Sequence, residues 1–144
     1  MSNEDTIGLL KECDAGVKMG IESVEMVLDK VNAEQLFSIL EKYLDDNKKL
    51  ENKINFELNK FKDNEKDPSS IAKSMSWLKI NFKLVKGEHD KVIADLMTDG
   101  CNMGIKSISK YLNQYSSAMK DIKGLCYDLI EIQEKFAKDL RKFL

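Results

Sequence analysis

The sequence is poor in the residues that break helices and in those that bind phosphate or metal. It has one proline, Pro68, one histidine, His89, and one arginine, Arg141. Because proline cannot continue a helix, its scarcity permits long helices. The net charge of −2 and the shortage of arginine leave no basic face for a phosphate backbone, so we expect no nucleic-acid partner.

Long apolar runs are also missing. No run approaches the roughly 18 residues that a membrane span needs, and the first stretch, MSNEDTIG, lacks the charged and then apolar pattern of a signal peptide. We therefore expect a cytoplasmic protein with no membrane partner.

Cysteine is sparse and unpaired in its spacing. Cys13, Cys101 and Cys126 lie far apart, and an odd number of cysteines argues against a disulfide framework. All three fall in apolar helical stretches, which favours buried thiols over redox chemistry.

What the chain does have is the composition of a helical domain. Its 144 residues are 42% apolar and 33% charged, which is typical of one mainly helical unit, so we predict a single domain over residues 1–144.

The spacing of apolar residues predicts a helical hairpin over residues 4–63. Apolar residues recur every three or four positions before and after Asn32, and Asn32 with Gln35 forms the pattern of a helix cap. The predicted buried stripe is Ile7, Leu10, Cys13, Val17, Ile21, Val24, Leu28 and Val31, then Leu36, Leu40, Tyr43, Asn47, Leu50, Ile54, Leu58 and Phe61.

A crossover helix and a second hairpin follow. Asp67 and Pro68 predict the start of a helix over residues 68–87, which Gly87 ends. A second hairpin over residues 88–144 has Ser116 or Ser117 as its internal cap. Its predicted stripe is Val92, Leu96, Cys101, Ile105, Ile108, Leu112 and Tyr115, then Ile122, Leu125, Leu129, Ile132, Phe136, Leu140 and Phe143.

One phrase occurs twice, as GVKMGIES at residues 16–23 and GCNMGIKS at residues 100–107, with a constant offset of 84. It suggests that the first helices of the hairpins correspond through a duplication. Glycine inside a helix costs about 1 kcal/mol relative to alanine, so the repeated glycines need a compensating role such as close packing. We predict that the two copies face each other.

Two hairpins joined by a crossover that keeps the second and third long helices parallel predict an all-α, ferritin-like four-helix bundle. The stretch LLKECDAGVKMGIESVEMVLDKVNAEQLFSILEKYLDDNKKLENKI, followed by SWLKINFKLVKGEHDKVIADLMTDG, resembles the bacterial ferritin-like family catalogued as domain of unknown function 2383. The most specific part is the crossover, with Trp77, Leu78 and Gly87. The resemblance implies a fold akin to ferritins and rubrerythrins, with no activity established for the family.

The sequence does not supply the ligands of a dimetal centre. Such bundles use two Glu-x-x-His pairs, whereas the only histidine, His89, is preceded three residues earlier by Lys86. A carboxylate-only set is conceivable, but its members are more typical of solvated helix faces: Glu22, Glu51, Glu131 and Glu134. We predict no catalytic, cofactor-binding or metal-binding residue and no cofactor.

Two functional hypotheses remain open. The first is a non-enzymatic bundle that acts through protein contacts, with a second copy or another protein as partner. The alternative is a degenerate iron or manganese protein of the ferritin and rubrerythrin type, with a carboxylate-only site or a ligand cavity between its hairpins. Asn47, on the apolar stripe, either fixes the register of the helices or binds a ligand.

Overall fold

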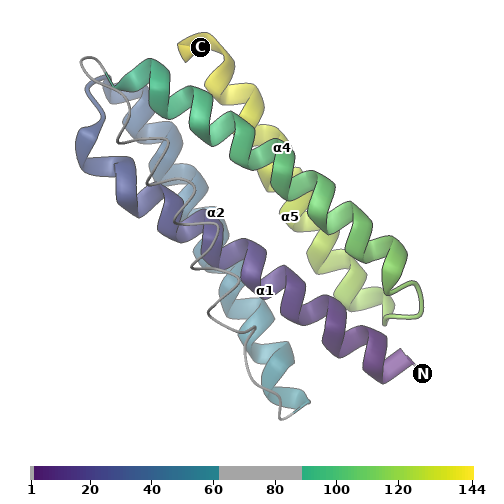
Figure 1. Ribbon diagram of the computed structural model, residues 1–144. Coiled ribbons are helices and arrows are strands. Elements are labelled where there is room, and N and C mark those ends of the chain that lie inside the picture. The colour runs from purple at the N-terminus through teal and green to yellow at the C-terminus, as the bar shows by residue number, and fades with distance from the viewer. Residues whose placement is uncertain (1, 62–88) are drawn as a thin grey trace.

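The computed structural model describes residues 2–61 and 89–144, and these residues form two antiparallel helical hairpins (Figure 1). The long helices are α1 Ser2–Val27, α2 Glu34–Lys60, α4 Asp90–Gln114 and α5 Lys120–Leu140, with the 3-10 turns η1 Leu28–Lys30 and η2 Arg141–Phe143. The predicted all-α class is confirmed over these residues. The crossover helix predicted for residues 68–87 lies outside them.

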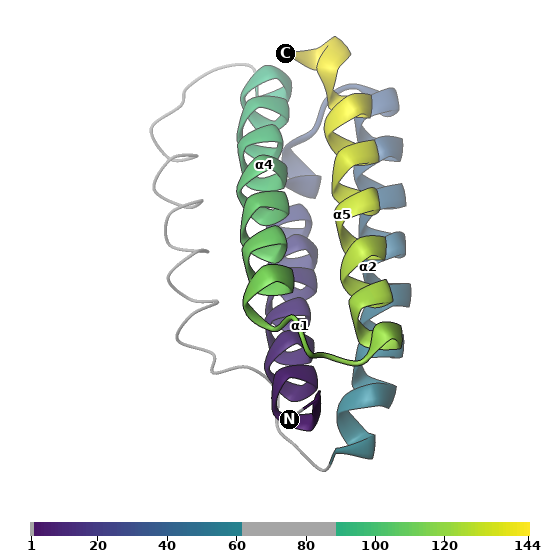
Figure 2. The same ribbon diagram turned by 90° about the vertical axis from the view of Figure 1, so that its right-hand side faces the viewer.

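The two hairpins pack side by side into a bundle. α1 packs on α2 and α4 packs on α5, while α2 with α5, α1 with α4 and α1 with α5 form the contacts between the hairpins. Figures 1 and 2 show that α2 and α4 begin at the same end of the bundle and run in the same direction, as the sequence predicts.

Hydrophobic periodicity explains which side of each helix is buried. In α2 the buried residues are those of the predicted stripe, Leu36 through Leu58 at every third or fourth position. In α4 the predicted stripe is confirmed in part: Leu96, Cys101 and Ile108 are buried, whereas Val92 and Ile105 are only half-buried. Ile93, Ala94 and Met97 are buried in addition. In α5, Cys126 and Gln133 are buried beside the predicted residues.

The core is divided into two clusters along the bundle axis. The cluster at the α1–α2 turn comprises Val24, Val27, Leu36, Leu40, Tyr43, Ile93, Ala94, Leu96, Met97, Cys101, Phe136 and Leu140. The cluster at the N-terminal end comprises Leu9, Leu10, Cys13, Val17, Ile21, Leu50, Ile54, Leu58, Ile108, Ala118, Ile122, Cys126 and Leu129. Each of the two clusters contains side chains from both hairpins.

The turn of the first hairpin is capped by the second hairpin. Both carboxylate oxygens of Asp90, the first residue of α4, accept hydrogen bonds from the turn, from Asn32 N at 2.8 Å and from Ala33 N at 2.9 Å. The N-cap residue of α2 is Ala33, without a side-chain cap. The prediction that Asn32 caps α2 is therefore wrong. The distant Asp90 carboxylate instead holds the turn through the backbone N–H groups of Asn32 and Ala33, just before the first residue of α2.

The turn of the second hairpin is capped in the same way by α1. Asp5 Oδ2 accepts a hydrogen bond from Ser117 N at 3.0 Å, and Thr6 Oγ1 accepts one from Met119 N at 2.8 Å. Met119 is the N-cap residue of α5 and makes no side-chain cap, so the predicted caps Ser116 and Ser117 are also wrong. Thr6 and Asp90 are separated by the same 84 positions as the repeated phrase.

Replacing Asp90 with alanine should lower the free energy of unfolding by about 1–2 kcal/mol, because two backbone donors of the α1–α2 turn lose their charged acceptor. Urea unfolding followed by circular dichroism measures the change. Asp95→Ala, at an exposed position of the same helix, is the matched control and should change stability by less than about 0.5 kcal/mol. Equal losses in the two variants would contradict the capping role.

Candidate functional site

A layer of three polar side chains crosses the middle of the bundle, and one of them, Tyr43, also belongs to the cluster at the α1–α2 turn. Tyr43 and Asn47 lie one turn apart on the buried face of α2, and Gln133 lies on the buried face of α5. Their exposed fractions are 6%, 0% and 4%, so water hardly reaches them. We call these three residues the central polar layer.

Stacking and hydrogen bonds order the central polar layer. The ring of Tyr43 stacks on the ring of Phe136 with centroids 3.8 Å apart and an interplanar angle of 11°. Asn47 Nδ2 donates a hydrogen bond of 2.7 Å to the carbonyl oxygen of Tyr43. Asn47 Oδ1 and Gln133 Oε1 are buried and accept no hydrogen bond, although a buried unsatisfied group costs about 1–3 kcal/mol. The predicted burial of Asn47 is confirmed.

Burial raises the pKa of Tyr43 above its ordinary value. Nearby Cys101 raises it further, while side-chain hydrogen bonds with Asn47 and Gln133 oppose the increase. Burial also raises the pKa of the Cys101 thiol to about 12. Both groups are therefore neutral near pH 7, and neither serves there as an activated nucleophile or base.

The repeated glycines make room for the amide side chains of this layer. A Cβ atom on Gly20 would lie 2.9 Å from Asn47 Oδ1 and 3.0 Å from Tyr43 Oη, and one on Gly104 would lie 3.0 Å from Gln133 Cδ. Each glycine thus receives an amide from the neighbouring helix of its own hairpin. A Cβ on Gly100 would meet nothing within 4 Å. The prediction that the two copies of the phrase face each other is therefore wrong.

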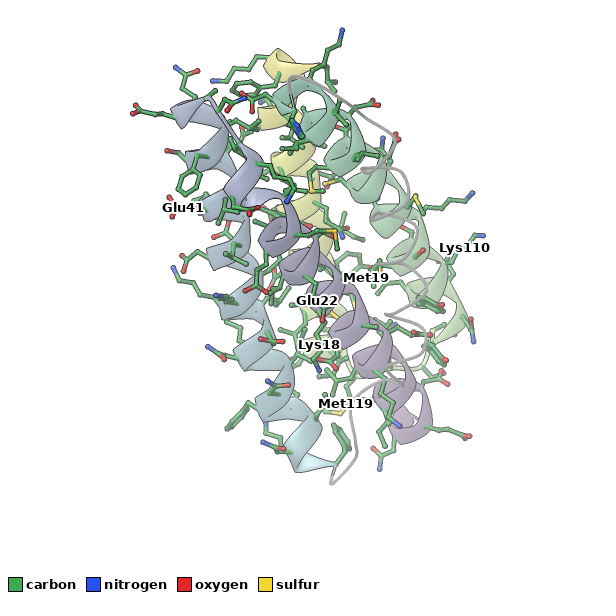
Figure 3. The ribbon with its side chains drawn as sticks, turned by 60° about the vertical axis from the view of Figure 1, so that its left-hand side comes forward. Lys18, Met19, Glu22, Glu41, Lys110 and Met119 are labelled. Atoms are coloured by element: carbon green, nitrogen blue, oxygen red, sulfur yellow. The ribbon has the colours of Figure 1, made fainter. Side chains whose placement is uncertain are left out.

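The four carboxylates considered as metal ligands do not meet. Glu22, Glu131 and Glu134 are exposed and Glu51 is half-buried. Figure 3 draws Glu22 on α1 near Lys18 and Met19, with Glu41 and Lys110 pointing away from opposite sides of the bundle. Over residues 2–61 and 89–144, no three histidine, cysteine, aspartate or glutamate side chains are close enough to hold a metal ion.

His89 is at the start of a helix, as predicted, where it is the N-cap residue of α4. It is half-buried, and the oxygens of the adjacent Asp90 carboxylate are engaged by the α1–α2 turn. Asp90 therefore has a structural role at the end of the bundle, away from the central polar layer.

Two of the three cysteines lie together in the fold, which their spacing along the sequence did not predict. All three cysteines are buried, as predicted. Cys13 of α1 and Cys126 of α5, however, are brought together in the cluster at the N-terminal end. The available signal was that Cys13 lies on the predicted apolar stripe of its helix and that Cys126 lies three residues before Leu129 of another stripe, but sequence alone does not say which stripes meet.

The outer seam between α2 and α5 contains two adjoining grooves, of about 370 and 410 Å³. Both are lined by Lys53, so we treat them as one feature, the α2–α5 furrow. Its lining from α2 is Asp46, Lys49, Leu50, Asn52, Lys53, Phe56 and Glu57, and its lining from α5 is Asp121, Leu125, Asp128, Glu131, Ile132 and Lys135.

Gly20→Ala should destabilise the fold by about 1–3 kcal/mol, because the new methyl group would crowd Asn47 and Tyr43 inside a packed core. Gly100→Ala is the matched control. It should stabilise the fold by up to about 1 kcal/mol, because alanine is the better helix former and its methyl group meets open space. Urea unfolding of both variants checks the difference, and a stabilising Gly20→Ala would contradict the close packing.

The raised pKa of Tyr43 predicts a loss of stability at alkaline pH. Above about pH 10 the tyrosine ionises in the unfolded chain but stays protonated in the fold, so the free energy of unfolding falls by up to about 1.4 kcal/mol per pH unit. In Tyr43→Phe this part of the fall disappears, which urea unfolding between about pH 9 and pH 11 measures. Tyr127→Phe removes an exposed tyrosine as the control, and identical pH profiles for the two variants would contradict the assignment.

Comparison of the chain with family models, curated proteins and solved structures gives no match. Among the described helices, none is both long and apolar enough to cross a membrane.

Proposed function

We propose that this chain is a non-enzymatic, ferritin-like helical bundle that acts through protein contacts, and that a second copy of the chain binds its α2–α5 furrow. The observation behind this proposal is the furrow itself. It combines apolar side chains with charges of both signs along two neighbouring helices. An interface typically has such an apolar centre with a polar rim.

The charges of one groove of the furrow are self-complementary, while the other groove adds the acidic side chains Glu57 and Asp121. The self-complementary groove is lined by three acidic and three basic side chains, namely Asp46, Asp128 and Glu131 with Lys49, Lys53 and Lys135. In a twofold dimer the same patch is present on both subunits, so a patch with equal numbers of both charges can face itself without net repulsion.

Phe56 supplies an aromatic anchor for the contact. Its side chain is 63% exposed, although it lines the furrow beside Leu125. Lys60 Nζ lies 4.7 Å from the centroid of its ring. Aromatic side chains are enriched among the residues that contribute most of the binding energy at interfaces, and covering Phe56 would remove a large apolar side chain from water.

The chemistry of the central polar layer supports a non-enzymatic role. The central polar layer offers a neutral tyrosine and two amides where catalysis would need a base, a nucleophile or a metal. The alternative of a degenerate iron or manganese protein draws no support from Glu22, Glu131 and Glu134, whose side chains are exposed.

Phe56→Glu should weaken self-association at least about tenfold, because a carboxylate would replace the aromatic anchor at the centre of the interface. Sedimentation equilibrium over a range of protein concentrations gives the dissociation constant. Tyr127→Glu is the matched control, since Tyr127 is 58% exposed on α5 but does not line the furrow.

The control variant should associate like the wild type. A wild-type protein that stays monomeric at every concentration would contradict self-association. If a pull-down from the native cell also recovered no partner, the result would count against the wider proposal of a role through protein contacts.

A further inference from the structure

Two cysteines that are 113 positions apart in the sequence lie against each other in the core. Cys13 belongs to α1 and Cys126 to α5, the first helix of one hairpin and the second helix of the other. Neither has any exposed surface, and both belong to the cluster at the N-terminal end. The thiols are free.

Helical periodicity aims each thiol at the other hairpin. Cys13 lies between Leu10 and Val17 on the buried face of α1, and Cys126 lies between Ile122 and Leu129 on the buried face of α5. The two side chains are in hydrogen-bonding contact with each other.

The first glycine of the repeated phrase brings these two helices close together. Gly16 follows Cys13 by three residues, and a Cβ atom at this position would lie 3.1 Å from Cδ2 of Leu129, which follows Cys126 by three residues. Any larger residue at position 16 would push against Leu129. The absence of a side chain therefore lets α1 approach α5 one turn from the thiol pair.

We propose that Cys13 and Cys126 are an oxidisable dithiol, and that their disulfide fastens the first hairpin to the second. The co-reactant is a small-molecule disulfide of the glutathione type. One cysteine thiolate attacks it to give a mixed disulfide and one free thiol, and the other cysteine thiolate then displaces a second thiol. Overall, the two cysteines lose two protons and two electrons, and the small disulfide takes them up as two thiols.

The folded environment protects the pair from rapid oxidation. Contact with the Cys126 thiol and burial raise the pKa of Cys13 well above its ordinary value, so little thiolate exists at neutral pH. Reaction then proceeds through transient opening of the bundle end, or while the chain folds. The link responds slowly to redox conditions, and once formed it is shielded from reduction.

The disulfide should stabilise the bundle because it joins distant parts of the chain. Closing a loop of more than 100 residues restricts the unfolded chain strongly, and stabilisation grows with loop length. The geometry also selects the pairing. Cys101 lies in the cluster at the α1–α2 turn, with the central polar layer between it and the other two thiols.

The full-length protein, equilibrated in buffers of reduced and oxidised glutathione with mild denaturant to speed opening, tests the proposal. After the remaining thiols are alkylated, peptide mass mapping should find Cys13 joined to Cys126 and Cys101 alkylated. The oxidised protein should melt about 10 °C higher than the reduced protein.

Cys101→Ser is the matched control and should keep both the linkage and the shift in melting temperature. Cys13→Ser should lose both, and the mapping is informative even if this variant is less stable, because it is carried out on peptides. The proposal is overturned if Cys13 and Cys126 stay alkylatable in the most oxidising buffer, if Cys101 is joined to either of them as often, or if the oxidised protein melts at a lower temperature.

Discussion

The bundle depends on reciprocal hydrogen bonds, in which side chains of each hairpin accept backbone donors from the turn of the other hairpin. The turn after α1 has two backbone donors, Asn32 N and Ala33 N, and Asp90 of the second hairpin accepts both. The turn after α4 is satisfied by Asp5 and Thr6 of the first hairpin. A separated hairpin would expose these donors without their partners. Pairing of the hairpins and completion of the turns are therefore one event, which favours cooperative folding.

The same quasi-symmetry organises the middle of the bundle. Gly20 receives Asn47 and Gly104 receives Gln133, so each hairpin contributes one glycine and one amide to the central polar layer. The amides keep unsatisfied oxygens, which lowers stability. A polar layer between two apolar clusters penalises sliding of the helices, because a shift of one turn would move the amides into apolar surroundings. Fixing the register of the helices is a physical reason for the chain to retain such a layer.

Periodicity made the helices and most of the core predictable. It identified the seven buried residues of α2 and the direction of α4 relative to α2. Periodicity did not predict the contacts that form between helices. The caps at Asn32 and Ser116 looked convincing locally, but the acceptors come from residues far away in the sequence. We expected the two copies of the repeated phrase to pack on each other because they are repeats. Instead, amide side chains from neighbouring helices lie against Gly20 and Gly104.

The candidate site was predictable only in part, for the same reason. Asn47 stood out because an amide interrupts an apolar stripe, whereas Gln133 was hidden among the polar residues of α5. Nothing in the spacing of Cys13 and Cys126 indicates that they meet. Pairing of stripes is a property of the assembled bundle, and no local pattern of the sequence encodes it.

Both the proposed disulfide and the proposed interface involve residues of α5. Cys126 faces inward toward Cys13, while its neighbours Leu125 and Asp128 line the α2–α5 furrow on the outside. A helix moves largely as a rigid element, so a change in α5 that accompanies disulfide formation also displaces part of the furrow. The closed interior and the exposed seam are thus mechanically connected. Because a binding equilibrium and a conformational equilibrium influence each other reciprocally, occupation of the furrow that holds α5 against α1 would in turn favour the oxidised pair.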